Sequence, residues 1–319
     1  MRAAQVTRLD GPSAIEVVDI AEPTADGGLL VDVHAVGISF PDLLLSKGEY
    51  QLKPELPFTL GVDFAGTVRE AGFGFAAGDR VACCLPYGGA AETVRLGADS
   101  VFPLPERLSF EQGAALPMNY LTAQFALAER AGLKEGETVL IHGAGGGVGT
   151  ATIQVAKGYG ARTIAVVSTD EKAAVARAAG ADEVVMVDGF LAATKELTGG
   201  RGVDVVLDVV GGDLFTDSLR ALGPQGRLLV VGFAAGGIPE VKVNRLLLNN
   251  IDVRGVGWGA YAMIRPGFMR KQWEELLPMM ESGLIDPPIG ATYDLPDFGR
   301  ALVDLEARKT VGKTVLKVR

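Results

Sequence analysis

Short apolar runs that alternate with polar positions, and that are broken by Gly and Pro, dominate the first third of the chain. The clearest of them read AIEVVDI, LLVDVHAVGI, DFAGTVREAG, DRVACCL and AAETVRL. Short strands at this spacing are typical of an all-β barrel or sandwich. We therefore expect a β domain at the N-terminal end.

The periodicity becomes helical in LSFEQGAALPMNYLTAQFALAERAGL, where Ser109, followed by Glu111 and Gln112, marks a helix entry. From Thr138 onward, strands and helices alternate. They read TVLIHGA, GTATIQVAKGYGA, TIAVVS, EKAAVARAAGA, EVVMVD, VDVVLDVV, GRLLVVGF and NIDVRGVGW. This order predicts an α/β fold with a parallel sheet covered by helices on both faces.

The C-terminal run KTVLKV has the pattern of a short strand but no partner nearby in the sequence. We expect it to pair with the N-terminal β domain. The α/β domain would then be an insertion, with residues 122–262 lying between the two parts of the other domain, 1–121 and 263–319.

Composition narrows the class of protein. The chain has 319 residues, a net charge of −9 and no apolar run near the roughly 18 residues of a membrane span. Its N-terminus lacks the apolar region of a signal peptide. The adjacent Cys83 and Cys84 exclude a disulfide framework and favour buried thiols in a reducing cytoplasm. The acidic balance and the lack of a basic stripe argue against nucleic-acid binding.

The segment TVLIHGAGGGVGTATIQVA takes an apolar strand through a glycine-rich turn into a helix. Gly146 would let the backbone approach a pyrophosphate, and Gly149 would let the helix pack closely on the strand. The helix N-terminus favours an anion. The expected cofactor-binding positions of the turn are Ala144, Gly145, Gly146, Gly147, Val148 and Gly149. The alternative is a plain tight turn in an α/β fold that binds no nucleotide.

The end of the second strand bears on the choice of cofactor. An acidic residue there would bind the ribose 2′-hydroxyl of NAD, but Ser168 occupies the position. Ser168 and Lys172 favour the 2′-phosphate of NADPH, whereas Asp170 and Glu171 oppose it. Lys172 is alternatively an ordinary solvated helix residue.

The chain resembles the medium-chain dehydrogenase/reductase superfamily, and within it the zinc-free quinone oxidoreductases that include zeta-crystallin. The resemblance covers essentially the whole chain. Its most specific segments are GISFPDLLLSKGEY, LPFTLGVDFAGTV, LPMNYLTAQFAL, GAGGGVG, VDVVLDVVGGD and NIDVRGVGWGAY. It implies a GroES-like β domain, an inserted Rossmann domain, NADPH as reductant and a homodimer. We expect the dimer to form through the run NIDVRGVGW, which is long and apolar and is expected to be the last strand of the sheet.

The resemblance also implies that no metal is used. Zinc enzymes of the superfamily have a Cys and a His-Glu pair where this chain has Ser39, Val62 and Asp63, and the cysteine-rich zinc lobe is missing. A catalytic zinc requires three protein ligands, and neither His34 nor His142 lies in such a cluster. Without a Lewis acid, reduction of an electrophilic quinone or enone is favoured over oxidation of an alcohol.

Family positions suggest roles for several side chains. Ser39 and Tyr50 are the expected catalytic residues, with the proton coming from Tyr50 or water. Thr122 would face the nicotinamide amide and Arg308 the 2′-phosphate. After the third strand of the α/β domain, family members often have a Tyr where this chain has Asp188, and this departure counts against NADPH. Side chains expected to line the substrate cleft between the domains are Phe40, Tyr50, Leu121 and Tyr261, with Phe233 and Trp258 toward the cofactor.

The expected function is NADPH-dependent reduction of a quinone or conjugated enone by hydride transfer without zinc. Two alternatives remain open. One is an enoyl-thioester reductase on the same scaffold, for which the sequence offers no basic entrance patch. The other is a non-catalytic, crystallin-like protein that binds NADPH or RNA, against which the acidic charge and the cleft motifs both argue.

Overall fold

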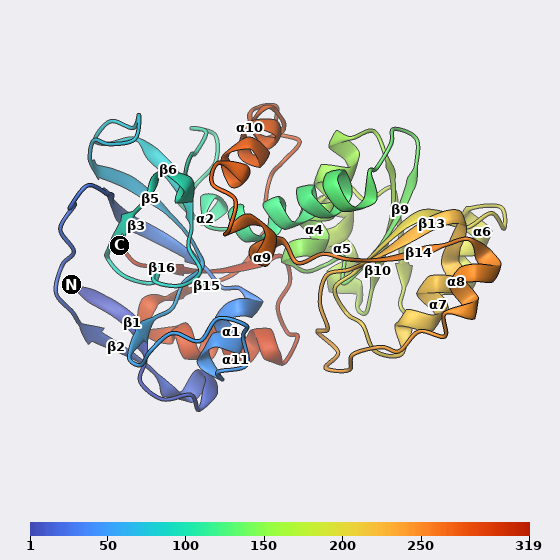
Figure 1. Cartoon of the computed structure of the whole chain (residues 1–319), viewed down its shortest axis with the longest axis horizontal. Helices are drawn as coiled ribbons and strands as arrows, with labels where there is room; N and C mark the ends of the chain where they lie inside the picture. The colour runs from blue at the N-terminus through green and yellow to red at the C-terminus, as the bar shows by residue number, and fades with distance from the viewer. The chain divides into compact units, whose positions relative to one another are not determined.

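The computed structural model describes all residues from 1 to 319, and they form two compact units (Figure 1). The first consists of Met1–Met118, Arg265–Glu274 and Pro287–Arg319, and the second of Asn119–Ile264 and Glu275–Asp286. The predicted α/β class, with one unit inserted into the other, is confirmed. The structure adds Glu275–Asp286 to the inserted unit, a segment that the sequence analysis had placed in the β domain.

The first unit contains two sheets, a large one of seven strands and a small one of three strands. The large sheet has the order β15-β16-β3-β5-β6-β8, and β7 pairs with β3. Its strands are β3 (Leu29–Gly37), β5 (Asp63–Glu70), β6 (Arg80–Cys84), β7 (Thr93–Leu96), β8 (Val101–Pro103), β15 (Ile289–Asp294) and β16 (Lys313–Lys317). The small sheet contains β1 (Arg2–Val6), β2 (Ile15–Asp19) and β4 (Phe58–Thr59).

The C-terminal strand β16 pairs antiparallel with β3 and parallel with β15. This confirms the prediction that KTVLKV returns to the N-terminal unit. Apolar residues of β3, β5 and β16, such as Val31, Phe64 and Leu316, are buried in one common core. The pairing therefore joins the two ends of the chain in one sheet with a shared hydrophobic core.

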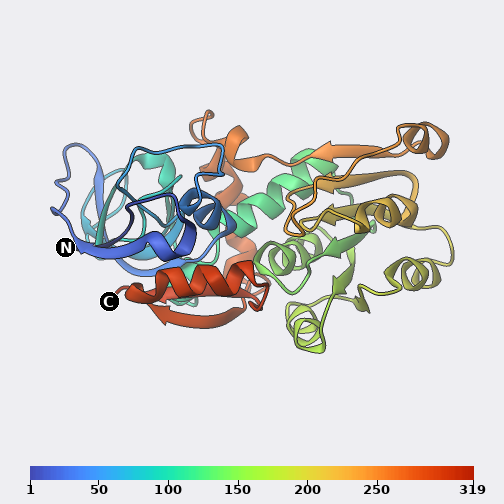
Figure 2. The same ribbon diagram turned by 90° about the horizontal axis from the view of Figure 1, so that it is seen from below.

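Short helices complete this unit. Helix α1 (Phe40–Ser46) contacts α11 (Phe298–Glu306), and α11 lies alongside β15 (Figure 2). The remaining elements are η1 (Gly11–Ala14), η2 (Ala98–Ser100), α2 (Phe110–Gly113), η5 (Leu295–Asp297) and the first part of α10 (Phe268–Glu281). Ser109 caps α2 by accepting a hydrogen bond from the Gln112 N–H, as the sequence predicted.

The second unit has a parallel six-stranded sheet in the order β11-β10-β9-β12-β13-β14. The strands are β9 (Thr138–His142), β10 (Arg162–Val167), β11 (Glu183–Met186), β12 (Val203–Asp208), β13 (Leu222–Val230) and β14 (Asp252–Gly255). This is the doubly wound sheet that the alternating pattern predicted: β10 and β11 are added on one side of β9, and β12, β13 and β14 on the other.

Helices cover both faces of this sheet (Figure 1). On one face lie α4 (Gly147–Gly158) and α5 (Asp170–Ala178), and on the other lie α6 (Phe190–Leu197), α7 (Leu214–Ala221) and α8 (Asn244–Asn249). A helical stretch of π and α turns runs through η3 (Pro117–Leu121), α3 (Thr122–Gln124) and η4 (Phe125–Ala131), and α9 (Trp258–Ala262) follows β14. No helix in the chain is both long and apolar enough to cross a bilayer.

The last strand of the sheet is shorter than expected. The run NIDVRGVGW was predicted to form a long apolar strand, but β14 has only four residues, and Asp252 at its start is exposed. Its position is as predicted, since β14 pairs with β13 and has no partner on its other side. The sheet therefore ends in a short free edge.

Candidate functional site

The glycine-rich turn of the second unit joins the fully buried strand β9 to helix α4. Gly143 has a φ of +66°, which side-chain-bearing residues rarely adopt, and Gly146 caps α4. A Cβ at Gly149 would lie 2.3 Å from the carbonyl oxygen of Gly143. Only glycine at this position lets α4 pack directly on the turn.

Two polar side chains lie beside this turn. A Cβ on Gly145 would come within 2.6 Å of the Cβ of Lys172, so the lysine packs against the turn itself. Its Nζ lies 3.4 Å from the Oγ of Ser168, the residue after β10, and Thr169 caps the helix that carries it. The structure thus brings together Ser168, Lys172 and the turn, which the sequence had singled out separately.

Asn119 also contacts the turn, a contact that the sequence does not predict. A Cβ at Gly147 would lie 2.6 Å from its side-chain nitrogen, and the side chain is buried. Thr122, three residues later, is likewise buried on α3. In the sequence, the only sign of this contact is that Asn119 is a polar residue in a mainly apolar helical run.

The turn fits the diphosphate of a dinucleotide. The first N–H groups of the twelve-residue α4 have no partners within the helix, and its dipole favours an anion there. Gly146 differs from Gly149, because a Cβ on it would approach nothing closer than 3.4 Å, the carbonyl oxygen of Gly143. The protein leaves the outer side of Gly146 open for a ligand.

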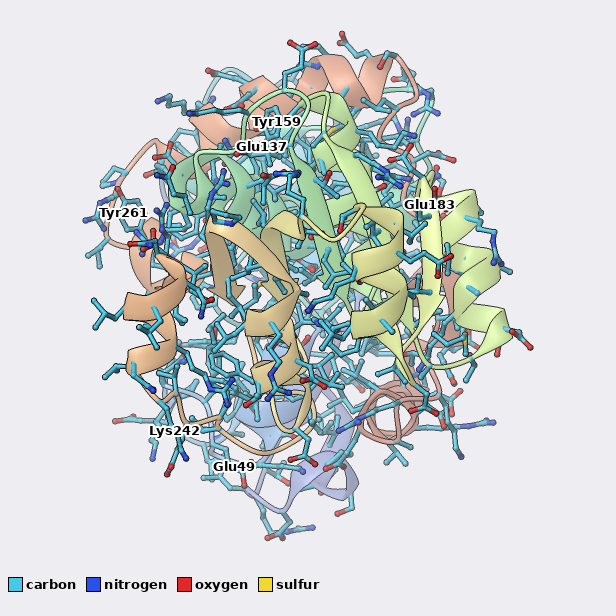
Figure 3. The ribbon with its side chains drawn as sticks, turned by 90° about the vertical axis from the view of Figure 1, so that its right-hand side faces the viewer. Glu49, Glu137, Tyr159, Glu183, Lys242 and Tyr261 are labelled. Atoms are coloured by element: carbon cyan, nitrogen blue, oxygen red, sulfur yellow. The ribbon has the colours of Figure 1, made fainter.

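The other predicted residues of this unit are placed differently. Leu121 and Trp258 are buried, so their side chains offer little surface to a ligand. Tyr261, which Figure 3 labels, is partly exposed. Its ring packs against that of Phe125, with the two centroids 5.0 Å apart. Phe233 follows β13 and is half-buried beside Gly211.

A buried polar cluster lies in the first unit, at the start of α1. The Lys313 ammonium donates hydrogen bonds to the Ser39 hydroxyl at 2.7 Å and to the Asp63 carboxylate at 2.8 Å. The Ser39 hydroxyl in turn donates to Asp63 at 3.0 Å. Lys313 is 4% exposed and Asp63 is 0% exposed, so this ion pair is removed from solvent.

Asp42 extends the cluster. Its carboxylate accepts the Gly61 N–H at 2.9 Å and the Ser39 N–H at 3.1 Å, which fixes the first turn of α1. Complete burial, reinforced by the nearby Asp63 charge, raises the pKa of Asp42 to about 7 despite these two bonds and the Lys313 charge. The cluster therefore contains a carboxyl group that titrates near neutral pH.

Cys84 stands opposite Asp63 in the pairing of β5 with β6. Burial raises the pKa of both Cys83 and Cys84 well above the usual range, so both remain protonated thiols. They are the buried free thiols that the sequence predicted. The half-buried Tyr50 also keeps its proton, because burial, and then the neighbouring Cys84 and Asp42, raise its pKa.

Ser39 and Tyr50 are predictable from the sequence, whereas Lys313 is predicted only as part of a strand. In the sequence, the only sign of its role is a lysine at the first position of the short strand KTVLK. Phe40, the residue after Ser39, is 42% exposed. Arg308 is exposed in the turn after α11, with a φ of +56°.

Both histidines have structural contacts. His34 stacks on Phe110 at 4.2 Å, and the Nε2 of the buried His142 lies 2.8 Å from the Ser218 hydroxyl. Burial lowers the pKa of both imidazoles. No group of three or more His, Cys, Asp or Glu side chains is arranged to hold a metal ion.

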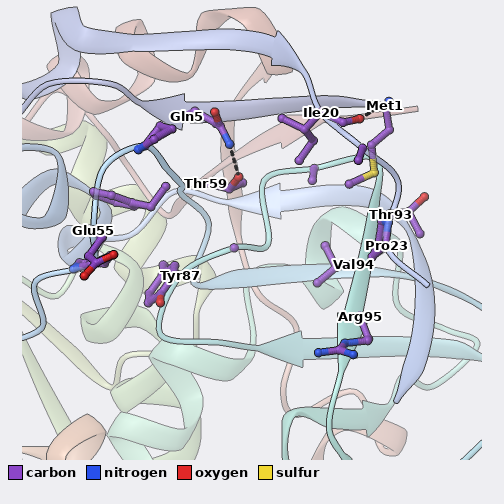
Figure 4. Close-up of a pocket in the computed structure, with 16 residues that line it drawn as sticks. Met1, Gln5, Ile20, Pro23, Glu55, Thr59, Tyr87, Thr93, Val94 and Arg95 are labelled. Atoms are coloured by element: carbon purple, nitrogen blue, oxygen red, sulfur yellow. Dashed lines mark hydrogen bonds between the residues drawn. The ribbon is translucent and has the colours of Figure 1, made fainter. Parts of the chain in front are cut away.

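A separate hollow of about 620 Å³ lies in the first unit, between β1, β4 and β7 (Figure 4). It is lined by Met1, Gln5, Tyr87 and Arg95, among others, and Gln5 donates to the Thr59 hydroxyl at 3.4 Å. None of the polar cluster's residues lines it. The hollow brings no set of catalytic groups together and is not the candidate site.

Two family models match the chain. The alcohol dehydrogenase GroES-like domain matches residues 25–106, and the zinc-binding dehydrogenase model matches residues 147–282. The chain is also 40% identical to quinone oxidoreductase-like protein 2 of Rattus norvegicus over 324 residues, which cover all of this chain and 92% of that protein.

The chain is also similar to solved structures of oxidoreductases. A probable oxidoreductase from Mycobacterium abscessus has a TM-score of 0.90 and 41% identity, over 100% of this chain and 99% of that one. Quinone oxidoreductase of Escherichia coli, solved in complex with NADPH, has a TM-score of 0.88 and 32% identity over the whole of both chains. The chain therefore belongs to the quinone oxidoreductase family of the medium-chain dehydrogenase/reductase superfamily.

Proposed function

We propose that this protein reduces a quinone or a conjugated enone with NADPH and without a catalytic metal. The observation that carries the proposal is the position of Lys172 and Ser168 beside the glycine turn, where an NAD-specific site would have a carboxylate. The E. coli relative bound to NADPH supports this choice of cofactor.

Each group of NADPH has a corresponding part of the chain. The N-terminus of α4 would bind the diphosphate, and Lys172 and Ser168 the 2′-phosphate. Thr122 would contact the nicotinamide amide, and Arg308 would add charge toward the 2′-phosphate. When bound, NADPH supplies the hydride.

The chain's own residues would orient the acceptor and provide a proton. Ser39 and Tyr50 are the proposed proton donors to the acceptor oxygen, since both carry an O–H group at neutral pH. Phe40 and Tyr261, which both expose part of their rings, are the proposed apolar contacts of the substrate. A quinone or enone is electrophilic enough that hydrogen bonds can replace a Lewis acid.

The test is to follow NADPH absorbance with a panel of quinones and enones, with an enoyl thioester and a simple alcohol plus NADP⁺ as comparisons. We expect NADPH consumption with a quinone or enone that survives exhaustive chelation. Faster turnover of the thioester would favour the enoyl-thioester reductase, and reversible alcohol oxidation alone would overturn the assignment. NADPH binding with no turnover of any acceptor would favour a non-catalytic role.

We also propose that the protein is a homodimer formed at the free edge of the second unit's sheet. Beside β14, α8 exposes Leu247 and Leu248, which are 76% and 73% exposed. A free strand edge with exposed leucines favours association, and a second copy is the simplest partner.

We further propose that the protein is cytoplasmic. Its two free thiols support a reducing location.

A further inference from the structure

We propose that Lys313 is a positioning residue for the reaction, an inference that rests on the proposed reductase function. Its ammonium group, anchored by Asp63, would orient the Ser39 hydroxyl and supply the positive charge that stabilises the oxyanion of the reduced substrate. Ser39 would be the catalytic residue that passes a proton to that oxyanion. Lys313 would act through Ser39.

The hydrogen bonds define the direction of proton transfer. An ammonium group can only donate, so the Ser39 oxygen accepts from Lys313 at 2.7 Å. The single hydroxyl proton of Ser39 then points to Asp63 at 3.0 Å. When a stronger acceptor appears beside Ser39, this proton can turn to it while Lys313 holds the oxygen in place.

The fold makes room for the lysine. Gly37 on β3 pairs with Asp63 on β5 and with Val315 on β16. A Cβ on Gly37 would lie 2.7 Å from the Cε of Lys313 and 2.1 Å from the Ala114 carbonyl oxygen. The absence of a side chain at Gly37 therefore opens the space that the Lys313 side chain occupies.

Burying this ion pair is costly in terms of stability. Desolvation of two charges commonly offsets their attraction, and apolar residues of similar volume often stabilise a protein as well or better. A buried pair that holds an additional hydroxyl group is thus better explained by chemistry than by stability. The ion pair's contact with Ser39 links it to the reaction.

The charged and titratable groups around Lys313 are few. Asp63 and Asp42 are the acidic ones. Burial raises the pKa values of the nearby Cys84 and Tyr50; the Asp63 and Asp42 charges raise that of Cys84 further, and the Asp42 charge that of Tyr50. Both remain neutral, so neither competes for the ammonium charge. Asp42 becomes charged only near neutral pH. At lower pH, Lys313 and Asp63 are therefore the charged groups of the cluster.

The proton balance closes without another reactant. Hydride addition leaves the substrate with an oxyanion, to which the Ser39 hydroxyl transfers its proton. The Lys313 ammonium passes a proton to the Ser39 oxygen and becomes a neutral amine. After the product leaves, the amine regains a proton from solvent by way of the Ser39 hydroxyl, so that one hydride and one proton are consumed for each substrate reduced.

The kinetic test compares Lys313→Met and Ser39→Ala with wild type, and uses Lys317→Met as the control. Lys317 lies on the same strand but is exposed. We expect kcat to fall about 100-fold in the first two variants, as for loss of an oxyanion donor, with NADPH affinity by fluorescence unchanged. Ser39→Thr, which keeps the hydroxyl, should restore most of the rate. Wild-type kcat in folded Lys313→Met would overturn the proposal.

Lys313→Met leaves Asp63 buried without its partner and can unfold the protein. The double variant Lys313→Met/Asp63→Asn removes both charges together and provides a folded counterpart. It should show the same loss of kcat and should also alter the pH profile of kcat. A double variant that is folded and fully active would exclude a role for the pair.

A binding assay tests the charge without turnover. 4-Nitrophenol ionises to a phenolate that absorbs visible light, and a nearby cation favours that form. We expect the phenolate fraction of bound nitrophenol to be larger in wild type than in the double variant at the same pH. Equal fractions, or no binding to wild type, would overturn the proposed charge effect. Because this assay needs no NADPH, it separates failure of the Lys313 proposal from failure of the reductase assignment.

Discussion

The ammonium nitrogen of Lys313 lies 2.8 Å from a carboxylate oxygen of Asp63, although the two residues are 250 positions apart in the chain. Each is the first residue of its strand, and β3 runs between these two strands in the sheet. The pairing of the C-terminal strand with β3 thus completes a polar site that begins at Ser39.

Gly149 and Gly146 should respond differently to a methyl group. In Gly149→Ala the new Cβ would meet the Gly143 carbonyl oxygen, and we expect a loss of about 1–3 kcal/mol in the free energy of unfolding. In Gly146→Ala the methyl group has room in the protein but would face the diphosphate. Thermal unfolding should therefore be nearly unchanged, while NADPH affinity drops. The reverse pattern would contradict the proposed binding mode.

Removal of the Lys172 charge should weaken NADPH more than NADH. We expect Lys172→Ala to raise the dissociation constant for NADPH about tenfold, roughly 1.4 kcal/mol, and to leave that for NADH nearly unchanged. Arg308→Ala should have the same selectivity, and the exposed Lys195→Ala provides a control. Titration of intrinsic fluorescence measures all four proteins, and equal losses for both cofactors would show that neither residue contacts the 2′-phosphate.

Asp42 should make stability depend on pH. Its pKa rises from an ordinary 3.8 to about 7 on folding, so between these values the folded protein holds a proton that the unfolded chain has released. The resulting stabilisation is complete below pH 3.8 and is lost as the pH rises through about 7. Relative to Asp42→Asn, wild type should lose about 1.4 kcal/mol per pH unit in that window. Urea unfolding at several pH values measures the free energy of unfolding of both proteins. The same dependence of this free energy on pH in wild type and in Asp42→Asn would disprove the prediction.

Tyr50→Phe should reduce the rate only modestly. The phenol is one of two proposed proton donors, and water offers a further route, so we expect at most about a tenfold loss in kcat. A loss of a thousandfold or more in steady-state assays would make Tyr50 the obligatory acid instead of Ser39.

The exposed leucines of α8 should control association. Leu247→Asp/Leu248→Asp should convert a dimer to a monomer in light scattering, because buried carboxylates are costly in an apolar interface. Val303→Asp, on an exposed apolar position of the first unit, should leave the dimer intact. A wild type that is already monomeric at micromolar concentration would exclude the dimer.

Much of the second unit was determined by sequence alone. The alternation of apolar runs predicted the parallel sheet, and the strand-turn-helix context of Gly146 and Gly149 identified the turn, because periodicity and backbone freedom are local properties. Ser168 could be placed at the end of its strand for the same reason. These features depend on neighbours within a few residues.

Only the tertiary structure decided the contents of the polar cluster. No local pattern joins Lys313 to Asp63 and Ser39, since their contact depends on the order of β16, β3 and β5 in the sheet. The contact of Asn119 with Gly147 and the burial of Leu121 likewise follow from packing between distant segments. Side-chain chemistry is written in the sequence, but which groups meet is set by strand order and by the space that residues such as Gly37 leave open.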